Sequence, residues 1–418
     1  MGRRNLLFVS PRFLFPVDSG GKIRTTQMLR GLKGGAFDIT LVSPASEAER
    51  SVHSADIAAV CDRFVGWSGT RSRWSKSVDR IAAIFSSLPV PVATDRSARG
   101  REIVEQELAR RPDVVVFDFA HSAVLAPRSL DVPSVLFTHN IEAEIFKRHA
   151  QVAKGPLALL WRDQFRKMRR FERDALAMFD AAIAVSTRDA DAFARDYEAR
   201  NVHTIGTGVD LDYFSHSAPT DSGRVVFTGS MDWLANRDGI DFLLDSVWPS
   251  LLERSPAATM CVVGRDPPQG LVRKAHQAGF DWQFTGYVDD VRPYVRAASA
   301  YVVPLRVGGG TRLKVYEAMA LGCPLVSTAI GVEGLPLVPG EHYLLADDAT
   351  QIAEALSRLV ADAQLRARLS AAARRFVEET CSYRVVARQF ERICQTVSSG
   401  ARDASGPREG GPSAVTNR

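Results

Sequence analysis

Residues 304–335, PLRVGGGTRLKVYEAMALGCPLVSTAIGVEGL, constrain the fold more than any other part of the chain. An apolar strand ending near Leu305 runs into Gly308-Gly309-Gly310, and Thr311 is a suitable N-cap for the helix that follows. That helix is predicted to end at Gly322, because glycine readily adopts the backbone conformation that terminates a helix. The stretch therefore predicts a strand, a glycine loop, a helix and a second strand.

The predicted helix carries only two charged residues, Lys314 and Glu317, between Leu313 and Leu321. It is therefore expected to be buried on nearly every side, with both charges on one face. A glycine loop that exposes backbone N–H groups at a helix N-terminus suits phosphate, and Glu317 suits ribose hydroxyls. The alternative interpretation is an internal Lys–Glu pair beside a tight turn.

The length of 418 residues predicts two to three domains, and a hydrophobic content of 45% with 24% charged residues is typical of soluble globular proteins. No apolar run approaches the roughly 18 residues that a membrane span needs. The N-terminal residues MGRRNLLFVSPRF pass from two arginines directly into a short strand. We therefore expect no cleaved signal and no transmembrane helix.

The cysteines are odd in number, widely scattered and without a C-x-x-C pair, which disfavours a disulfide framework and a zinc site and favours a reducing cytoplasm. They are Cys61, Cys261, Cys323, Cys381 and Cys394. The formal charge of +5 comes without the dense basic tract of a nucleic-acid-binding protein. Nucleic acid is therefore not expected as a partner, whereas phosphate-bearing substrates and anionic lipid stay open.

Short β-branched runs alternate with helix-like or loop segments through the first half of the chain. This alternation predicts an α/β fold with a parallel, doubly wound sheet. The predicted strands are residues 6–10, 38–42, 114–117, 134–137, 181–186 and 202–205. A Rossmann-like N-terminal domain is therefore expected over residues 1–206.

Gly20 and Gly21 lie in the predicted first βα turn, before a helical segment expected from about Arg24 to Leu32. Backbone at the carboxyl end of a strand can approach a ligand closely where glycine removes the side chain. The sequence SGGKIR is not the G-x-G-x-x-G dinucleotide pattern, and a plain turn explains two glycines equally well.

His139 and Asn140 come directly after the strand predicted at residues 134–137. Ligands bind at the carboxyl ends of strands in such sheets, so His139 is a candidate to contact the reacting part of a bound ligand. A hydrogen-bonded structural histidine is the alternative.

Two segments of the first half are basic and helix-like, residues 67–91 and residues 161–173. Each is compatible with a basic amphipathic helix on the surface of an anionic membrane. Each is also compatible with a solvated helix that turns an apolar stripe to the core.

The second half of the chain repeats the pattern of the first. Its predicted strands are residues 225–229, 259–264, 282–286, 300–303 and 325–327. A second Rossmann-like domain is expected over residues 207–380, followed by a helix over residues 381–397 that packs back on the N-terminal domain. Residues 398–418 contain too few apolar side chains to fold and are expected to be disordered.

Taken together, these segments resemble the retaining family 4 glycosyltransferases, which have the GT-B fold of two facing Rossmann-like domains. The segment KVYEAMALGCP is similar to the most recognisable signature of that family. The phrases FTGSMDWLANRDG and GYVDDVRPYVRAASAYVVPLR are similar to a subgroup tied to bacterial exopolysaccharide or lipopolysaccharide assembly. Further similarities lie at Gly20-Gly21, residues 139–142, residues 180–186, residues 208–210 and Gly229.

The resemblance implies a nucleotide-diphosphate sugar as donor, held mainly by the C-terminal domain, with the acceptor on the N-terminal domain. Glu317 matches the second glutamate of the paired-glutamate motif of the family, which binds the ribose. Gly309 stands eight residues earlier, where the family usually has the glutamate that contacts the donor sugar. The backbone positions expected to approach the donor are Gly20, Gly21, Gly229, Gly309, Gly310 and Thr311.

A second departure from the family lies near Gly229, where Ser230 replaces the common phosphate-binding arginine and Asn236 replaces its lysine. A leaving diphosphate needs positive charge, which side chains and helix termini then have to supply. The substitutes in this chain are Arg237, Arg312 and Lys314. Phosphate binding is therefore predicted to have moved toward the helix that follows the glycine loop.

The resemblance also implies transfer with retention of configuration, without a metal ion, a cofactor or a side-chain nucleophile. Asp289 and Asp290 are adjacent rather than spaced like a metal-binding pair, and we interpret them as a helix cap before Val291. The implied acceptor is lipid-linked or a glycan, in cell-surface polysaccharide or glycolipid biosynthesis, at the inner face of the cytoplasmic membrane. Two alternatives are a degenerate GT-B module that binds a nucleotide or glycan without turnover, and a nucleotide-sugar epimerase.

Overall fold

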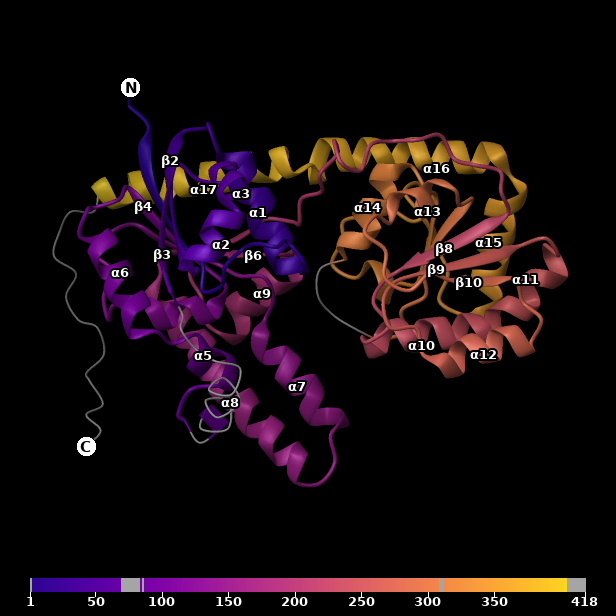
Figure 1. Cartoon of the computed structure of the whole chain (residues 1–418), viewed down its shortest axis with the longest axis horizontal. Helices are drawn as coiled ribbons and strands as arrows, with labels where there is room; N and C mark the ends of the chain where they lie inside the picture. Colours follow the sequence, from indigo (N-terminus) through magenta and orange to yellow (C-terminus); the bar gives the residue numbers. More distant parts are fainter. Residues whose placement is uncertain (1, 69–82, 85, 308–311, 404–418) are drawn as a thin grey trace.

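The computed structural model describes residues 2–68, 83–84, 86–307 and 312–403. These residues form two α/β domains that lie side by side (Figure 1), each built on a sheet of parallel strands. The predicted fold class of two domains with parallel sheets is confirmed.

The N-terminal sheet has seven parallel strands in the order β3-β2-β1-β4-β5-β6-β7. The strands are β1 (Arg4–Val9), β2 (Phe37–Pro44), β3 (Arg63–Trp67), β4 (Val114–Asp118), β5 (Ser134–Phe137), β6 (Ala181–Ala184) and β7 (Val202–Thr204). Every residue of β4 is buried, as expected for a parallel strand covered by helices on both faces. The strand order reverses between β1 and β4, which places the ligand-binding crevice of such sheets at their carboxyl ends.

Two helices of this domain, α7 and α8, form a hairpin that projects away from the rest of the domain (Figure 1). Together with α9 they connect β5, β6 and β7. The helices are α1 (Gly20–Leu32), α2 (Glu47–Val52), α3 (Ser54–Ala58), α5 (Val90–Asp95), α6 (Ala98–Leu108), η1 (Ala120–Leu125), α7 (Glu142–Val152), α8 (Pro156–Met178) and α9 (Thr187–Asp196).

The C-terminal sheet has six parallel strands in the order β10-β9-β8-β11-β12-β13. The strands are β8 (Arg224–Thr228), β9 (Thr259–Val263), β10 (Trp282–Phe284), β11 (Ala300–Val303), β12 (Leu325–Ser327) and β13 (Leu344–Leu345). The helices are α10 (Leu234–Phe242), η2 (Leu243–Val247), α11 (Trp248–Arg254), α12 (Gln269–Gln277), α13 (Arg292–Arg296), α14 (Leu313–Leu321), η3 (Ile330–Val332), α15 (Ala349–Ala361), α16 (Ala363–Phe376) and η4 (Val377–Cys381).

The chain passes between the domains twice, and the two crossings pair with each other. The amide of Val209 donates to the carbonyl of Cys381 at 2.7 Å, and the amide of Tyr383 donates to the carbonyl of Val209 at 3.0 Å. A side chain at Gly208 would place its Cβ 2.7 Å from the Cα of Tyr383, so glycine permits this close approach.

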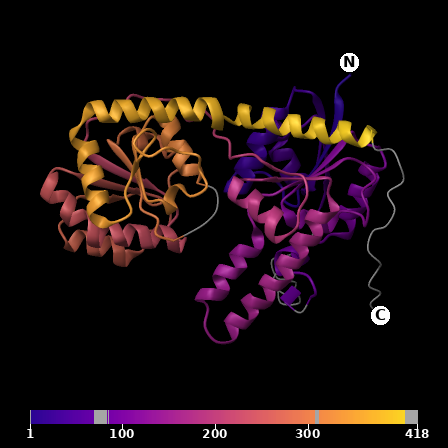
Figure 2. The ribbon, with the colours of Figure 1, turned by 180° about the vertical axis from the view of Figure 1, so that it is seen from behind.

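The last helix, α17 (Tyr383–Asp403), runs across the N-terminal domain and packs on α1 (Figures 1 and 2). Its apolar face, which includes Val386, Ala387 and Phe390, joins the core on that side of the N-terminal sheet. The C-terminal end of the described chain therefore belongs structurally to the first domain.

Two predicted boundaries are wrong. Helix α17 continues to Asp403, past the predicted end at residue 397, because Ser398 is buried and accepts a hydrogen bond from Arg4 Nη1 at 2.8 Å. Helix α1 begins at Gly20, so the two glycines form its first turn instead of a loop before it. Only residues 404–418 of the predicted disordered tail lie outside the described chain.

Among the described residues, no helix combines the length and the apolar character needed to cross a bilayer. Most of the first predicted basic helix lies outside those residues, as do Gly309, Gly310 and Thr311. The second basic segment, residues 161–173, lies within α8.

Candidate functional site

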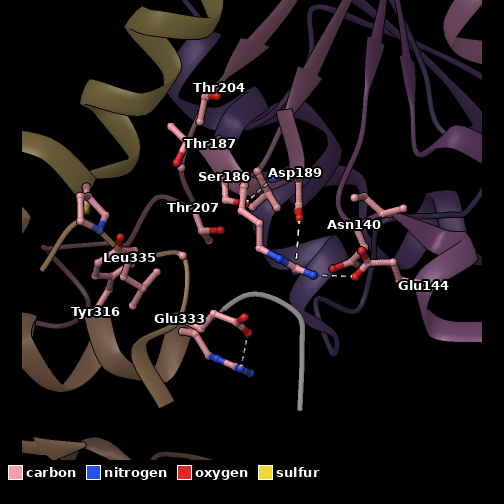
Figure 3. A pocket seen from close by; sticks show the side chains of 18 of the residues that line it. Asn140, Glu144, Ser186, Thr187, Asp189, Thr204, Thr207, Tyr316, Glu333 and Leu335 are labelled. Atoms are coloured by element: carbon pink, nitrogen blue, oxygen red, sulfur yellow. Dashed lines mark hydrogen bonds and ion pairs between the residues drawn. The ribbon is translucent and has the colours of Figure 1, made fainter. Parts of the chain in front are cut away.

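A cleft with a volume of about 370 Å³ lies between the two domains (Figure 3). Residues that follow β5, β6 and β7 line one wall, and residues that follow β11 and β12 line the other. The cleft thus lies at the carboxyl ends of strands from both sheets, where ligands of such folds bind. Its volume falls in the range of about 300–1,000 Å³ that is typical of small-molecule sites.

The N-terminal wall combines two arginines with a carboxylate. Glu144 accepts hydrogen bonds from Arg148 at 3.1 Å and from Arg188 at 2.9 Å. Arg188 also lies 3.7 Å from Asp189, and both residues belong to the first turn of α9, which Ser186 caps. This wall therefore offers fixed guanidinium groups beside a helix N-terminus, which suits an anionic group of a ligand.

Arg312, at the start of α14, belongs to the opposite wall and is only 4% exposed. Its Nη2 donates to the carbonyl of Ile330 at 2.9 Å and lies 4.0 Å from the Glu333 carboxylate. Burial lowers the pKa of Arg312, Glu333 opposes that shift, and Arg148 and Arg188 lower the pKa further. Positive charge from both domains thus converges on the cleft.

Helix α14 matches its prediction except at the N-cap, which is Arg312 and not Thr311. It runs from Leu313 to Leu321, ends at Gly322 with φ 83°, and buries every residue except Lys314 and Glu317, which are partly buried. The left-handed conformation at Gly322 is the common way to end a helix and is accessible to glycine at little cost. The two charges therefore lie on the one face that the core does not cover completely.

Lys314 points to the turn after β8. Its Nζ donates to Asn236 Oδ1 at 3.0 Å and lies 4.3 Å from the ring centroid of Phe227. Desolvation lowers the pKa of Lys314 to about 7, with Arg312 adding to the shift and Glu317 opposing it. An ammonium group held in such surroundings is typical of functional sites rather than of surface lysines.

Glu317 has a raised pKa, to about 7, because desolvation disfavours its carboxylate more than Lys314 favours it. Within the part of the chain that the structure describes, its carboxylate accepts no hydrogen bond and lies beyond ion-pair distance of Lys314. The alternative interpretation of an internal Lys–Glu pair is therefore not what the structure shows. As far as the described residues show, the carboxylate is therefore available to a ligand.

Two glycines bring the backbones after β8 and β9 together. Gly229 and Gly264 both have φ of 156°, and a Cβ at Gly264 would lie 2.0 Å from the carbonyl oxygen of Gly229. A Cβ at Gly229 would lie 3.0 Å from Lys314 Nζ and 2.7 Å from Asn236 Nδ2. Glycine at position 229 therefore leaves the space in which Lys314 and Asn236 meet.

Sequence reasoning missed Arg265, which follows β9 and Gly264. Its Nε donates to Ser230 Oγ at 2.9 Å, and its Nη2 lies 3.3 Å from Asp232. A guanidinium thus lies beside Ser230, where the sequence had indicated a missing arginine. The available signal was its position directly after an apolar strand, at the carboxyl edge of the sheet.

His139 follows β5, as predicted, but its ring is buried inside the N-terminal domain. Its Nε2 lies 2.7 Å from Asp118 Oδ1, and its ring stacks on Phe119 with centroids 3.8 Å apart. Desolvation lowers the pKa of His139 and Asp118 opposes that shift. Among the described residues, Asn140 lines the cleft but the adjacent His139 does not. Contact of His139 with a bound ligand therefore stays a prediction.

The remaining predicted positions are separated in space. Arg237 lies on α10, is exposed, and follows the Asn236 that bonds to Lys314. Gly21 packs against the ring of Phe119, since a Cβ there would lie 2.5 Å from Phe119 Cζ. Asp290 accepts a hydrogen bond from the backbone amide of Arg292 at 2.9 Å, but the N-cap of α13 is Val291, so the predicted cap is one residue out of place.

This architecture, two parallel sheets whose carboxyl ends meet at one cleft, defines the GT-B class of folds. The structure of HepE from Anabaena in complex with UDP and glucose aligns with 95% of this chain and all of that chain, with a TM-score of 0.64 and 15% identity. At that identity the likeness concerns the fold alone.

Two family models match the two halves of the chain. Residues 19–213 match Glycosyltransferase Family 4, and residues 222–362 match Glycosyl transferases group 1. The chain therefore belongs to the glycosyltransferase family that these models describe.

Two curated relatives are also named as sugar transferases. A phosphatidyl-myo-inositol mannosyltransferase of Mycobacterium leprae is 32% identical over 205 residues, which is 47% of this chain and 54% of the relative. The lipopolysaccharide core biosynthesis glycosyltransferase LpsE of Rhizobium meliloti is 30% identical over 177 residues, 40% of this chain and 48% of the relative. The chain thus spans about half the length of the curated relatives it matches.

Proposed function

We propose that the protein transfers a sugar from a nucleotide-diphosphate donor to a lipid-linked or glycan acceptor, in cell-surface polysaccharide or glycolipid biosynthesis. The observation that carries this proposal is the pair Lys314 and Glu317 on one face of α14, beside the Gly229 turn. Membership of the glycosyltransferase family supports it, as do relatives named for glycolipid and lipopolysaccharide synthesis.

In this proposal the C-terminal domain binds the donor. Lys314 and Arg265 lie near the Gly229 turn and offer positive charge to the diphosphate. The carboxylate of Glu317, which has no hydrogen-bond partner among the described residues, accepts hydrogen bonds from ribose hydroxyls. Arg312 adds charge at the cleft, where the bond between sugar and diphosphate breaks.

The proposed chemistry proceeds with retention of configuration and needs no side-chain nucleophile. The acceptor hydroxyl attacks the anomeric carbon on the face from which the diphosphate departs. The bond from that carbon to the diphosphate oxygen breaks, and the hydroxyl proton passes to the departing phosphate. Cationic groups aimed at the developing negative charge lower the barrier, and domain closure excludes the water that would otherwise hydrolyse the donor.

The N-terminal wall of the cleft takes the acceptor in this account, with Arg148 and Arg188 facing it. Exposed arginines along α8 attract the protein to the anionic lipids on the inner face of the cytoplasmic membrane. They are Arg162, Arg166, Arg169, Arg170 and Arg173. Sedimentation of the protein with vesicles tests this membrane contact. If the fraction bound did not depend on the content of anionic lipid, the proposed contact would be wrong.

A second candidate is a GT-B module that binds a nucleotide or glycan without turnover, favoured by glycine at position 309 in place of a sugar-contacting glutamate. A panel of UDP- and GDP-sugars, offered with candidate glycan and lipid acceptors, separates the two. Transfer or slow donor hydrolysis, with NMR showing retained anomeric configuration in the product, supports the enzyme. Saturable donor binding without transfer or hydrolysis supports the module.

Chelation of divalent cations is expected to leave the transfer rate within about twofold of the untreated enzyme. The physical reason is that Lys314, Arg265 and Arg312 supply the charge that a metal would otherwise bring. The measurement is initial rate in EDTA against buffer alone. A rate that fell at least tenfold in EDTA and returned with added Mg²⁺ would contradict metal independence.

Donor affinity is expected to fall as the pH rises above about 7. The pKa of Lys314 is lowered to about 7, so its ammonium is present below that value and is lost above it, about tenfold per pH unit. Glu317 gives an opposite decline, because its carboxylate is lost as the pH falls through about 7. Calorimetry between pH 5.5 and 9 should therefore show a maximum near 7.

The variant Lys314→Arg separates the two limbs of that profile, since a guanidinium stays protonated throughout this pH range. It should keep the acid-side decline and lose the alkaline one. An alkaline decline that persisted unchanged in Lys314→Arg would assign it to another group.

The substitution Gly229→Ala is expected to weaken donor binding about tenfold, the factor that corresponds to about 1.4 kcal/mol. The new methyl group would press on Lys314 Nζ and Asn236, at a φ of 156° that residues with a Cβ rarely adopt. Calorimetry with the donor measures the effect, and circular dichroism checks the fold. Gly270→Ala on α12 is the control, because its Cβ meets nothing within 4 Å.

A further inference from the structure

An apolar groove with a volume of about 420 Å³ lies along the projecting α7–α8 hairpin. Its volume is within the range of sites that hold small molecules. The hairpin extends away from the domain in both views (Figures 1 and 2), and the groove lies between its two helices and residues Ile84, Val90 and Pro91. The apolar side chains that line it include Val90, Pro91, Ile145, Phe146, Leu160 and Trp161.

Two polar side chains, Gln164 and His149, line the groove among the described residues. Gln164 Oε1 accepts from the amide of Val90 at 2.8 Å, and its Nε2 donates to Asp163 at 3.3 Å. The ring of His149 stacks on Trp161 with centroids 4.6 Å apart. The other residues that line the groove are apolar, so a hydrocarbon occupant fits it best.

Ile145 connects this groove to the interdomain cleft, because its side chain lines both. One turn further along α7, Arg148 lines the cleft and His149 lines the groove. Residues three and four apart are neighbours on a helix surface. The apolar groove and the cleft arginine Arg148 thus lie within a single turn of α7.

We propose that the groove binds the hydrocarbon chain of a lipid-linked acceptor while the anionic head of that acceptor lies in the cleft beside Arg148 and Arg188. This assignment rests on the proposed transferase function. Two observations support it: Ile145 lines both the groove and the cleft, and Arg148 and Arg188 place positive charge in the cleft next to it. At the tip of the hairpin Leu157 and Leu159 are exposed, next to Lys154 and Arg162, as expected where a segment meets an anionic lipid surface.

Alkyl phosphates test the groove without any sugar donor. Octyl, decyl and dodecyl phosphate, below their micelle concentrations, should bind with an affinity that rises about fourfold for each added methylene until the groove is full. A dodecyl phosphate brominated near its chain end should quench the fluorescence of Trp161. The variant Trp161→Phe identifies that signal among the other tryptophans.

Two variants block the groove in different ways. Ile145→Glu places a charge at the residue that lines both groove and cleft, where the side chain is already 39% exposed. Leu160→Trp fills apolar space in the groove. Each should weaken dodecyl phosphate binding at least tenfold and flatten the dependence on chain length. Val52→Glu, at an exposed apolar residue on α2, is the matched control and should stay within twofold of the unsubstituted protein.

Affinity independent of chain length, or quenching unchanged in both blocking variants, would overturn the proposal. No probe binding at all would overturn it as well, because the groove would then be filled by the chain itself or by a second copy. Donor turnover and donor binding are measured without the probe, so failure here leaves the proposed transferase function standing. Failure of donor binding with intact chain-length dependence would instead leave a lipid site without the proposed chemistry.

Discussion

Replacing Lys314 by alanine is expected to lower kcat/KM for the donor by about 10²–10³-fold, the usual effect of removing a preorganised group that stabilises developing charge. The Nζ of Lys314 lies 3.0 Å from Asn236 Oδ1, beside the Gly229 turn, where a diphosphate can meet both the ammonium and exposed backbone. Its partly buried setting strengthens the interaction, because charge is screened less there than at the surface. Steady-state kinetics with the donor varied measures the effect.

The control for this variant is Lys274→Ala on α12, whose ammonium pairs with Asp245 at 2.6 Å on the surface. Loss of a surface ion pair should leave turnover within about twofold of the wild type. A rate for Lys314→Ala close to that of Lys274→Ala would contradict the phosphate role of Lys314. The diphosphate would then have to be assigned to Arg265, Arg237 and Arg312.

The variant Glu317→Gln is expected to weaken donor binding by about 10- to 100-fold, which corresponds to the loss of one or two hydrogen bonds to a charged acceptor. The amide keeps the shape of the side chain but accepts from ribose hydroxyls without the negative charge. Binding measured by calorimetry at pH 7.5 is the direct readout. At that pH the larger part of the native carboxylate is ionised, since its pKa is raised to about 7.

This variant should not unfold the protein. A folded pKa above the unfolded one means that ionising Glu317 costs the fold free energy at neutral pH, and glutamine removes that cost. The Tm should therefore be equal or slightly higher. Glu253→Gln on α11, at an exposed position, is the control, and unchanged donor affinity in Glu317→Gln would refute the ribose assignment.

Most of the fold could be predicted from the sequence because most strands are continuous apolar runs. VVVFD of β4 is buried on both faces of a parallel sheet, and such a run has few alternatives once turn residues bound it. The strands that were missed carry weaker signals. β3 contains Gly66 at the edge of its sheet, and β13 has only two residues, so neither forms a recognisable run.

The helix ends were harder to predict because tertiary contacts set them. Helix α1 begins at Gly20, where Gly21 packs on the ring of Phe119, and Phe119 lies almost a hundred residues further along the chain. Helix α17 keeps its last turns because Ser398 is buried against Arg4. Local propensity does not record either contact.

The C-terminal half of the site was largely visible in the sequence because its residues lie close together on α14. Lys314 and Glu317 share one face of one helix, and that spacing is readable. The contact of Lys314 with Asn236 joins residues 78 positions apart, and Arg265 meets Ser230 across 35 positions. Such pairings follow from strand order and not from any local pattern.

The N-terminal half could be predicted only in outline. The sequence placed His139 at the end of a strand, and the structure agrees, but its bond to Asp118 holds the ring inside the domain. The charged side chains that reach the cleft from this domain come from α7 and α9 instead, and no local sequence pattern distinguishes them. Neither the apolar groove of the hairpin nor its connection through Ile145 had a sequence signal.

The most direct test of the central claim, that the Lys314–Glu317 face of α14 binds a nucleotide diphosphate, is thermal unfolding in the presence of UDP, GDP or ADP. A ligand that binds only the native state stabilises it by about 2.7 kcal/mol at a concentration 100 times its Kd. We expect one of the three nucleotides to raise the Tm clearly, and the same nucleotide to lose most of its effect on Glu317→Gln. No shift with any of them at millimolar concentration, or an equal shift in both proteins, would contradict the account.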